Sequence, residues 1–145
     1  MGFLTGKTAI ITGAGRAVLK DGSCGSIGYG IATAYAKEGA NLVITGRNVK
    51  KLEAAKQELE NLYGIKVLTV QADVCAGGDN EATVANVVKQ AVDTFGGIQV
   101  LINNAQASAS GVPLAEHTTE QFDLAIYSGL YAAFYYMKAC YPYLA

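Results

Sequence analysis

Few features of this sequence favour disorder, disulfide bonds or a metal site. Proline occurs only twice and no low-complexity tract is present, so the 145 residues suffice for one folded domain with a sizeable core. The three cysteines, Cys24, Cys75 and Cys140, are widely spaced and lie near no histidine cluster. We expect reduced thiols rather than a disulfide framework or a metal centre.

Neither sign of charge is in excess, and no apolar run is long. The 11 basic and 12 acidic residues nearly cancel, which argues against nucleic acid or a membrane surface as a partner. The uncharged run of 14 residues at 124–137 is shorter than the ~20 residues that a membrane span needs. The first residues also lack the basic flank and long apolar run of a secretory signal. We therefore expect a cytoplasmic protein.

Short apolar runs alternate with helical patterns along the chain. Apolar residues recur at helical spacing between these runs, and glycines follow each helical stretch. This alternation predicts right-handed crossovers and a parallel sheet with helices on both faces. We expect a single α/β domain, a Rossmann-type doubly wound fold with strand order 3-2-1-4. Its strands are predicted at residues 8–12, 41–45, 66–71 and 99–104.

A glycine-rich turn follows the first predicted strand and precedes a helix that starts near Ser26. Free backbone N–H groups and the positive end of the helix meet at such a turn, and both suit a pyrophosphate. Glycine is needed because the backbone must turn tightly and approach the phosphate without an intervening Cβ atom. The strand before the turn and the helix after it indicate a dinucleotide site.

The turn after the second predicted strand has no acidic residue. NAD enzymes use an acid there to bind the ribose 2′-hydroxyl, whereas an arginine accommodates a 2′-phosphate. This chain has Gly46 and Arg47 at that position, and Arg16 in the glycine-rich turn offers a second cation. The pattern predicts NADP as the cofactor.

Further candidates follow the third and fourth predicted strands. The carboxylate of Asp73 can accept a hydrogen bond from an adenine amino group, and Val74 can cover the ring. Residues 103–106, which include Asn104, Ala105 and Gln106, leave the fourth strand. Ligands of open α/β sheets bind at these carboxyl ends, so we expect all of these residues at one cleft.

The glycine-rich turn, "TGRN", "ADV" and "NNAQ", in this order, resemble the short-chain dehydrogenase/reductase family over essentially all 145 residues. In that family the turn reads Thr-Gly-x-x-x-Gly-x-Gly. Gly13 matches the first glycine, Ser26 followed by Ile27 stands at the second, and Gly28 matches the third. Residues 17–25 then form an excursion, which a loop tolerates at small cost. The resemblance implies that the cofactor-binding residues are Gly13, Arg16, Ser26, Ile27, Gly28, Arg47, Asn48, Asp73, Val74, Asn104, Ala105 and Gln106.

The sequence departs from the family pattern at one cofactor-binding position and at its catalytic positions. Gln106 replaces a glycine of Asn-Asn-Ala-Gly, and Gly129 stands where the family has an asparagine of its catalytic tetrad. No Tyr-x-x-x-Lys motif is present, because the residue four before Lys138 is Phe134. We therefore predict no catalytic residue in this chain.

The fourth predicted strand would be an exposed apolar edge, which is an aggregation hazard. Together with the missing motif, this predicts that residues 1–145 are the NADP-binding portion of one longer short-chain dehydrogenase domain. The 145-residue chain alone is expected to show no turnover.

The stretches "SIGYGIA", "TGRN", "NNAQASASG" and "QFDLAIYSGLYAAFYYM" are most similar to bacterial hydroxysteroid dehydrogenases that act on bile acids, the 12α type especially. The resemblance implies hydride transfer between NADP(H) and a secondary alcohol or ketone of a steroid. A fatty-acid-type reductase acting on 3-oxoacyl or enoyl thioesters and a non-catalytic NADP-binding module remain open alternatives. The apolar, tyrosine-rich helix at 119–142 implies a homodimer or homotetramer.

Overall fold

The computed structural model describes residues 2–73, 75 and 80–145. Four strands form one parallel sheet in the order β3-β2-β1-β4, which confirms the predicted fold class and strand order. The strands are β1 (Thr8–Ile11), β2 (Asn41–Gly46), β3 (Val67–Gln71) and β4 (Val100–Ile102).

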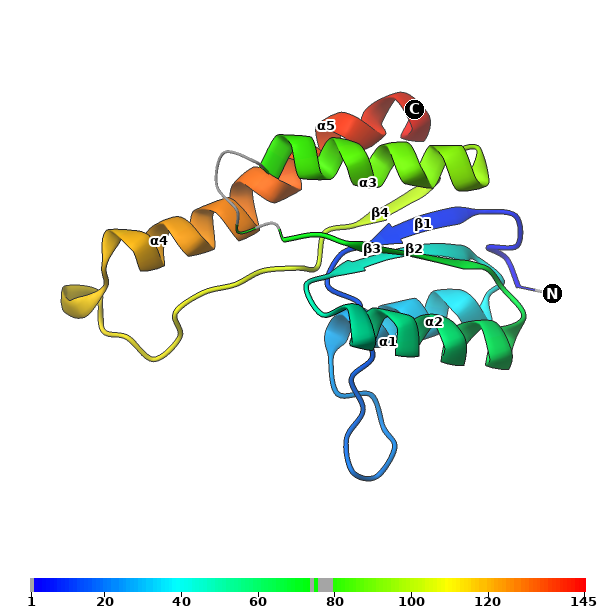
Figure 1. Cartoon of the computed structure of the whole chain (residues 1–145), viewed down its shortest axis with the longest axis horizontal. Coiled ribbons are helices and arrows are strands. Elements are labelled where there is room, and N and C mark those ends of the chain that lie inside the picture. The colour runs from blue at the N-terminus through cyan, green and yellow to red at the C-terminus, as the bar shows by residue number, and fades with distance from the viewer. Residues whose placement is uncertain (1, 74, 76–79) are drawn as a thin grey trace.

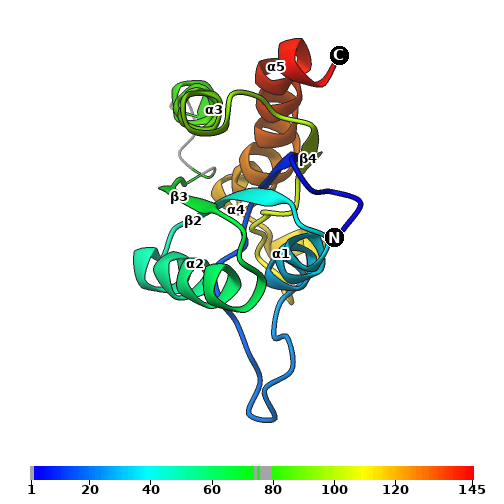
Figure 2. The same ribbon diagram turned by 90° about the vertical axis from the view of Figure 1, so that its right-hand side faces the viewer.

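Helices cover both faces of the sheet, as Figures 1 and 2 show. On one face lie α1 (Ile27–Lys37) and α2 (Val49–Tyr63), which pack against Ile11 and Ile44. On the other face, α3 (Asn80–Phe95) and α5 (Ala132–Leu144) pack against Ile10 and Val43. Successive strand residues point to opposite faces, so each buried strand contributes to two separate cores.

Local signals in the sequence explain where the first helices begin and end. The Ser26 side chain caps α1 by accepting a hydrogen bond from the Tyr29 N–H. Asn48 caps α2 in the same way, with 3.0 Å between its Oδ1 and the Lys51 nitrogen. Gly64 ends α2 at a φ of 68°, a left-handed conformation that glycine adopts without strain.

The C-terminal segment forms a long helical arm that extends past the end of the sheet (Figure 1). After the short η2 (Leu114–Glu116), it consists of α4 (Thr119–Ala125), the π-helical η3 (Ile126–Tyr131) and α5. A capping box starts α4, because Thr118 and Gln121 exchange side-chain and backbone hydrogen bonds. No helix among the described residues is both long and apolar enough to cross a membrane.

The excursion at residues 17–25 is a closed loop that projects from the base of α1 (Figures 1 and 2). Val18 and Cys24 form an antiparallel bridge. The Gly25 nitrogen lies 2.7 Å from the Ala17 carbonyl oxygen, so the two ends of the excursion meet. The insertion therefore leaves the helix and strand on either side of it in place.

The strand ends differ from the prediction at β4, which is shorter than the predicted span of 99–104. Asn104 leaves the sheet because its backbone N–H donates to the Thr12 hydroxyl, at 2.9 Å, instead of joining a strand ladder.

Candidate functional site

The carboxyl ends of β1 and β4 are joined by a compact set of hydrogen bonds around Thr12. The Thr12 Oγ1 accepts from the backbone N–H groups of Asn104 and Ala105, each at 2.9 Å. The Asn104 side-chain amide donates back to the carbonyl oxygens of Thr12 and Gly13, at 3.0 and 3.2 Å. These bonds fix the loops that follow β1 and β4 relative to each other.

The glycine-rich turn is packed too tightly for side chains at two positions. Gly13 has a φ of 68°, and a Cβ atom there would lie 3.1 Å from the Ala105 Cα. A Cβ atom on Gly28 would lie 2.1 Å from the Gly13 carbonyl oxygen, which is backbone and cannot give way. The first turn of α1 therefore sits directly against the end of β1, and Ile27 beside it is 76% exposed.

A cleft of about 220 Å³ opens at the carboxyl ends of the strands. All four strands contribute to it, since each is followed by a loop at this edge of the sheet. This is the place where open α/β sheets bind ligands. The lining residues are Gly13, Thr45, Gly46, Arg47, Ala72, Asp73, Cys75, Asn104, Ala105, Gln106 and Ala107.

Charged groups of both signs line this cleft. Arg47 is exposed directly after β2, and its carbonyl oxygen accepts a hydrogen bond from the Gln71 side chain at 3.1 Å. Asp73 accepts from the Cys75 N–H at 2.9 Å. Burial, and then the negative charge of Asp73, raise the pKa of the Cys75 thiol, so this cysteine stays protonated near neutral pH.

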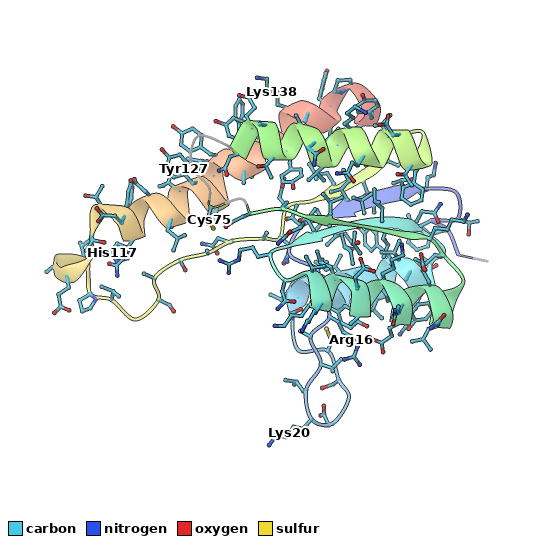
Figure 3. The ribbon with its side chains drawn as sticks, viewed as in Figure 1. Arg16, Lys20, Cys75, His117, Tyr127 and Lys138 are labelled. Atoms are coloured by element: carbon cyan, nitrogen blue, oxygen red, sulfur yellow. The ribbon has the colours of Figure 1, made fainter. Side chains whose placement is uncertain are left out.

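Arg16 is turned away from the cleft. Its Nε lies 2.6 Å from Oε2 of Glu58 on α2, and the two form an ion pair. Figure 3 shows Arg16 at the base of the excursion and Lys20 at its tip. That Arg16 adds a second cation to the phosphate site therefore stays a prediction, because in this structure its guanidinium is paired with Glu58.

A second cavity, of about 400 Å³, lies between the end of β4 and the helical arm. Ser128 ties the two together, because its Oγ accepts from the Ala107 N–H at 2.9 Å. Gly129 faces Gln106, whose Cγ lies 3.5 Å from the position of a Cβ atom on the glycine. The Tyr136 hydroxyl is buried with no partner among the described residues, and burial raises the pKa of Tyr136 to about 12.

The structure thus brings together half of the twelve predicted residues. Six of them line the first cleft: Gly13, Arg47, Asp73, Asn104, Ala105 and Gln106. Gly28 packs behind Gly13, Ser26 and Asn48 cap helices, and Val74 lies outside the described residues. Figure 3 places His117 at the far end of the helical arm, away from the sheet.

Sequence reasoning missed Thr12, Ser128 and Tyr136 as parts of the site. Thr12 carried a usable signal, because it ends an apolar strand just before the glycines. Ser128 and Tyr136 carried none, since only the packing of the helical arm brings them to the loop after β4.

The chain is similar in sequence to proteins of one known family. A family model described as short chain dehydrogenase matches residues 7–145. A 12alpha-hydroxysteroid dehydrogenase from a Clostridium species is 61% identical over 144 residues, which are 99% of this chain and 53% of that enzyme. The chain therefore spans about half the length of this curated relative.

Solved structures share the fold at lower identity. L-sorbose reductase from Gluconobacter frateurii, complexed with NADPH and L-sorbose, is 30% identical with a TM-score of 0.82, covering 97% of this chain and 48% of that one. An alcohol dehydrogenase from Thermococcus sibiricus, complexed with 5-hydroxy-NADP, is also 30% identical with a TM-score of 0.82, covering 95% and 53%.

Proposed function

Because the chain belongs to the short-chain dehydrogenase family, we propose that it binds NADP(H) for an oxidoreductase acting on a secondary alcohol or ketone. The observation that carries the cofactor assignment is the position of Arg47 in the cleft, directly after β2. Gly46, Arg47 and Asn48 include no carboxylate to bind a ribose 2′-hydroxyl, and a guanidinium there suits a 2′-phosphate. The NADPH and 5-hydroxy-NADP bound by the two solved relatives support the assignment.

The residues present fit a dinucleotide. Because Gly13 and Gly28 have no Cβ atoms, the turn packs closely between the end of β1 and the first turn of α1, and it lies at the positive end of that helix. In this proposal the backbone N–H groups of the turn bind the pyrophosphate, and Arg47 binds the 2′-phosphate. Asp73 lines the same cleft and would accept a hydrogen bond from the adenine amino group.

The nicotinamide supplies the hydride, and the chain supplies its binding and orientation. The second cavity continues from Asn104, Ala105 and Gln106 toward the helical arm, so both cavities share this loop. Ser128 and Thr12 hold the loop from opposite sides. The role of these residues is to position the reacting ring, while we assign the proton donor to sequence outside residues 1–145.

We assign residues 1–145 to the NADP-binding portion of one longer domain. The relative with 61% identity supports this, because the match covers only 53% of its length. The same relative supports a steroid carrying a 12α-hydroxyl, or the matching 12-ketone, as the substrate. The exposed apolar residues of the helical arm further support self-association of the complete protein.

The test is a cofactor and substrate assay on the full-length protein. We expect NADPH-dependent reduction of a 12-oxo bile acid, with kcat/KM at least about tenfold above that for the 7-oxo isomer. The Arg47→Asp variant should lose about tenfold or more in NADPH affinity and gain in NADH affinity, because the new carboxylate repels the 2′-phosphate and accepts from a 2′-hydroxyl.

Lys66→Asp is the matched control. It makes the same change of charge at an exposed residue that precedes β3. This residue lies at the amino end of the strand, whereas the cleft lies at the carboxyl ends. Equal NADPH and NADH affinities in the parent protein would refute the cofactor assignment. Turnover with acyl thioesters but not with steroids would favour a fatty-acid-type reductase. NADPH binding without turnover of any of these substrates would favour a non-catalytic module.

A further inference from the structure

The ion pair of Arg16 belongs to a three-residue cluster between the glycine-rich turn, α1 and α2. One oxygen of Glu58, Oε2, accepts from the Arg16 guanidinium and also from the Tyr29 hydroxyl. Both hydrogen bonds lower the pKa of Glu58, so its carboxylate is fully ionised near neutral pH. Arg16 therefore contacts a full negative charge.

This contact can open without a large loss. The side chains of Arg16 and Glu58 are 37% and 31% exposed, so water can solvate both groups when they separate. Tyr29 would remain as a donor to the carboxylate. The Arg16–Glu58 ion pair can therefore form and break reversibly, unlike a buried ion pair.

The backbone of Arg16 lies close to the proposed phosphate site. Its N–H donates to the Lys51 carbonyl oxygen at 2.9 Å, at the first turn of α2. Lys51 is only four residues after Arg47, whereas Glu58 is seven residues further along α2, or about 10 Å of helix. The long side chain of Arg16 therefore starts between two places where a negative charge can sit.

From this geometry we propose that Glu58 is a positioning residue that competes with the 2′-phosphate of NADP(H) for Arg16. It holds Arg16 away from the cleft until a phosphate beside Arg47 offers a second anion. Glu58 then weakens NADP(H) binding and has no effect on NAD(H), which lacks that phosphate. The inference rests on the proposed cofactor, and it adds Glu58 as a residue that sets how strongly the protein prefers NADP(H) over NAD(H).

The test is a set of binding titrations with NADPH, NADH and adenosine 2′,5′-bisphosphate. We expect Glu58→Gln to tighten NADPH and bisphosphate binding by about three- to fivefold and to leave NADH unchanged, the size expected for one partly exposed ion pair. Arg16→Gln should weaken NADPH binding by a similar factor. In the double variant Glu58→Gln should have no further effect, because its action passes through Arg16.

Glu60→Gln is the control, since it removes the same charge from the same helix two residues away. A parent protein without NADPH preference would refute the proposed cofactor. NADPH preference with no change in Glu58→Gln, or an equal change for NADPH and NADH, would refute the competition alone. If Glu58→Gln does not fold, Glu58→Asp shortens the reach to Arg16 and should shift NADPH affinity in the same direction; an unchanged affinity would overturn the proposal.

Discussion

Among single residues, Gly28 places the strictest limit on the site. Its Cα faces the Gly13 carbonyl oxygen so closely that a methyl group would lie 2.1 Å from it. Because this contact joins a Cβ position to a backbone carbonyl oxygen, no flexible side chain can move aside to relieve it. Any larger residue must push α1 away from the turn that we assign to the pyrophosphate.

We predict that Gly28→Ala lowers the free energy of unfolding by about 1–3 kcal/mol, the cost of overpacking, and weakens NADPH binding. Urea denaturation and the NADPH titration measure the two effects.

Gly30→Ala is the matched control on the same helix. A Cβ atom there would lie 3.3 Å from the Cys24 sulfur, at the end of a side chain that can shift. Because alanine favours a helix interior over glycine, we expect it to be neutral or to stabilise by about 0.5–1 kcal/mol. Equal losses in the two variants would contradict the role given to Gly28.

The sequence predicts individual residues well where the local chain determines their place. Arg47 directly follows β2 and Asp73 lies two residues after β3, so their arrival at one cleft follows from the parallel sheet alone. The direction of Arg16 could not be predicted, because its partner Glu58 lies 42 residues away on another helix.

At the scale of elements, the excursion is the unusual feature of the glycine-rich turn. At its ends, the Gly25 nitrogen lies 2.7 Å from the Ala17 carbonyl oxygen. The next residues inward, Val18 and Cys24, form an antiparallel bridge that joins the two sides of the loop. Neither core contains a residue of the excursion. The loop therefore adds little to the stability of the sheet.

We predict that deleting residues 17–25, which joins Arg16 to Ser26, leaves the melting temperature within about 4 °C and NADPH affinity within about threefold. The shortened chain would have the spacing of the family's turn. Thermal unfolding followed by circular dichroism checks the first value and fluorescence titration the second. A loss of NADPH binding in a folded variant would show that the excursion itself contacts the cofactor.

Elements were predictable in type but less so at their ends. Apolar runs and helical spacing located all four strands and the helices between them. The sequence pattern does not predict the π-helical η3 within the arm. In this segment the Ser128 hydroxyl donates to the Leu124 carbonyl oxygen, at 2.7 Å, and accepts from the Ala107 N–H of the loop after β4. Contacts of this kind depend on tertiary packing, which periodicity does not report.

For the whole molecule, the helical arm presents an apolar stripe to solvent. Leu130, Phe134, Met137 and Tyr141 are 63, 52, 54 and 70% exposed. They recur at intervals of four and three residues, so they lie along one side of the arm. A second copy of the arm, related by a two-fold axis, would cover this stripe.

We predict that Leu130→Lys with Phe134→Lys converts the full-length protein to a smaller species in sedimentation velocity. Two like charges facing their symmetry mates would be buried without partners, which is strongly unfavourable. Leu62→Lys, which changes an exposed leucine on α2, should leave the mass unchanged. An unaltered mass in the double variant would exclude the arm as the interface.

The excursion at residues 17–25 also has a practical consequence, because its two ends meet. Since Ala17 and Gly25 meet at its base and Lys20 lies at its outer tip, foreign sequence can be grafted between residues 19 and 23. An epitope or fluorescent reporter placed there would leave the sheet undisturbed, because the two ends of the excursion meet at its base.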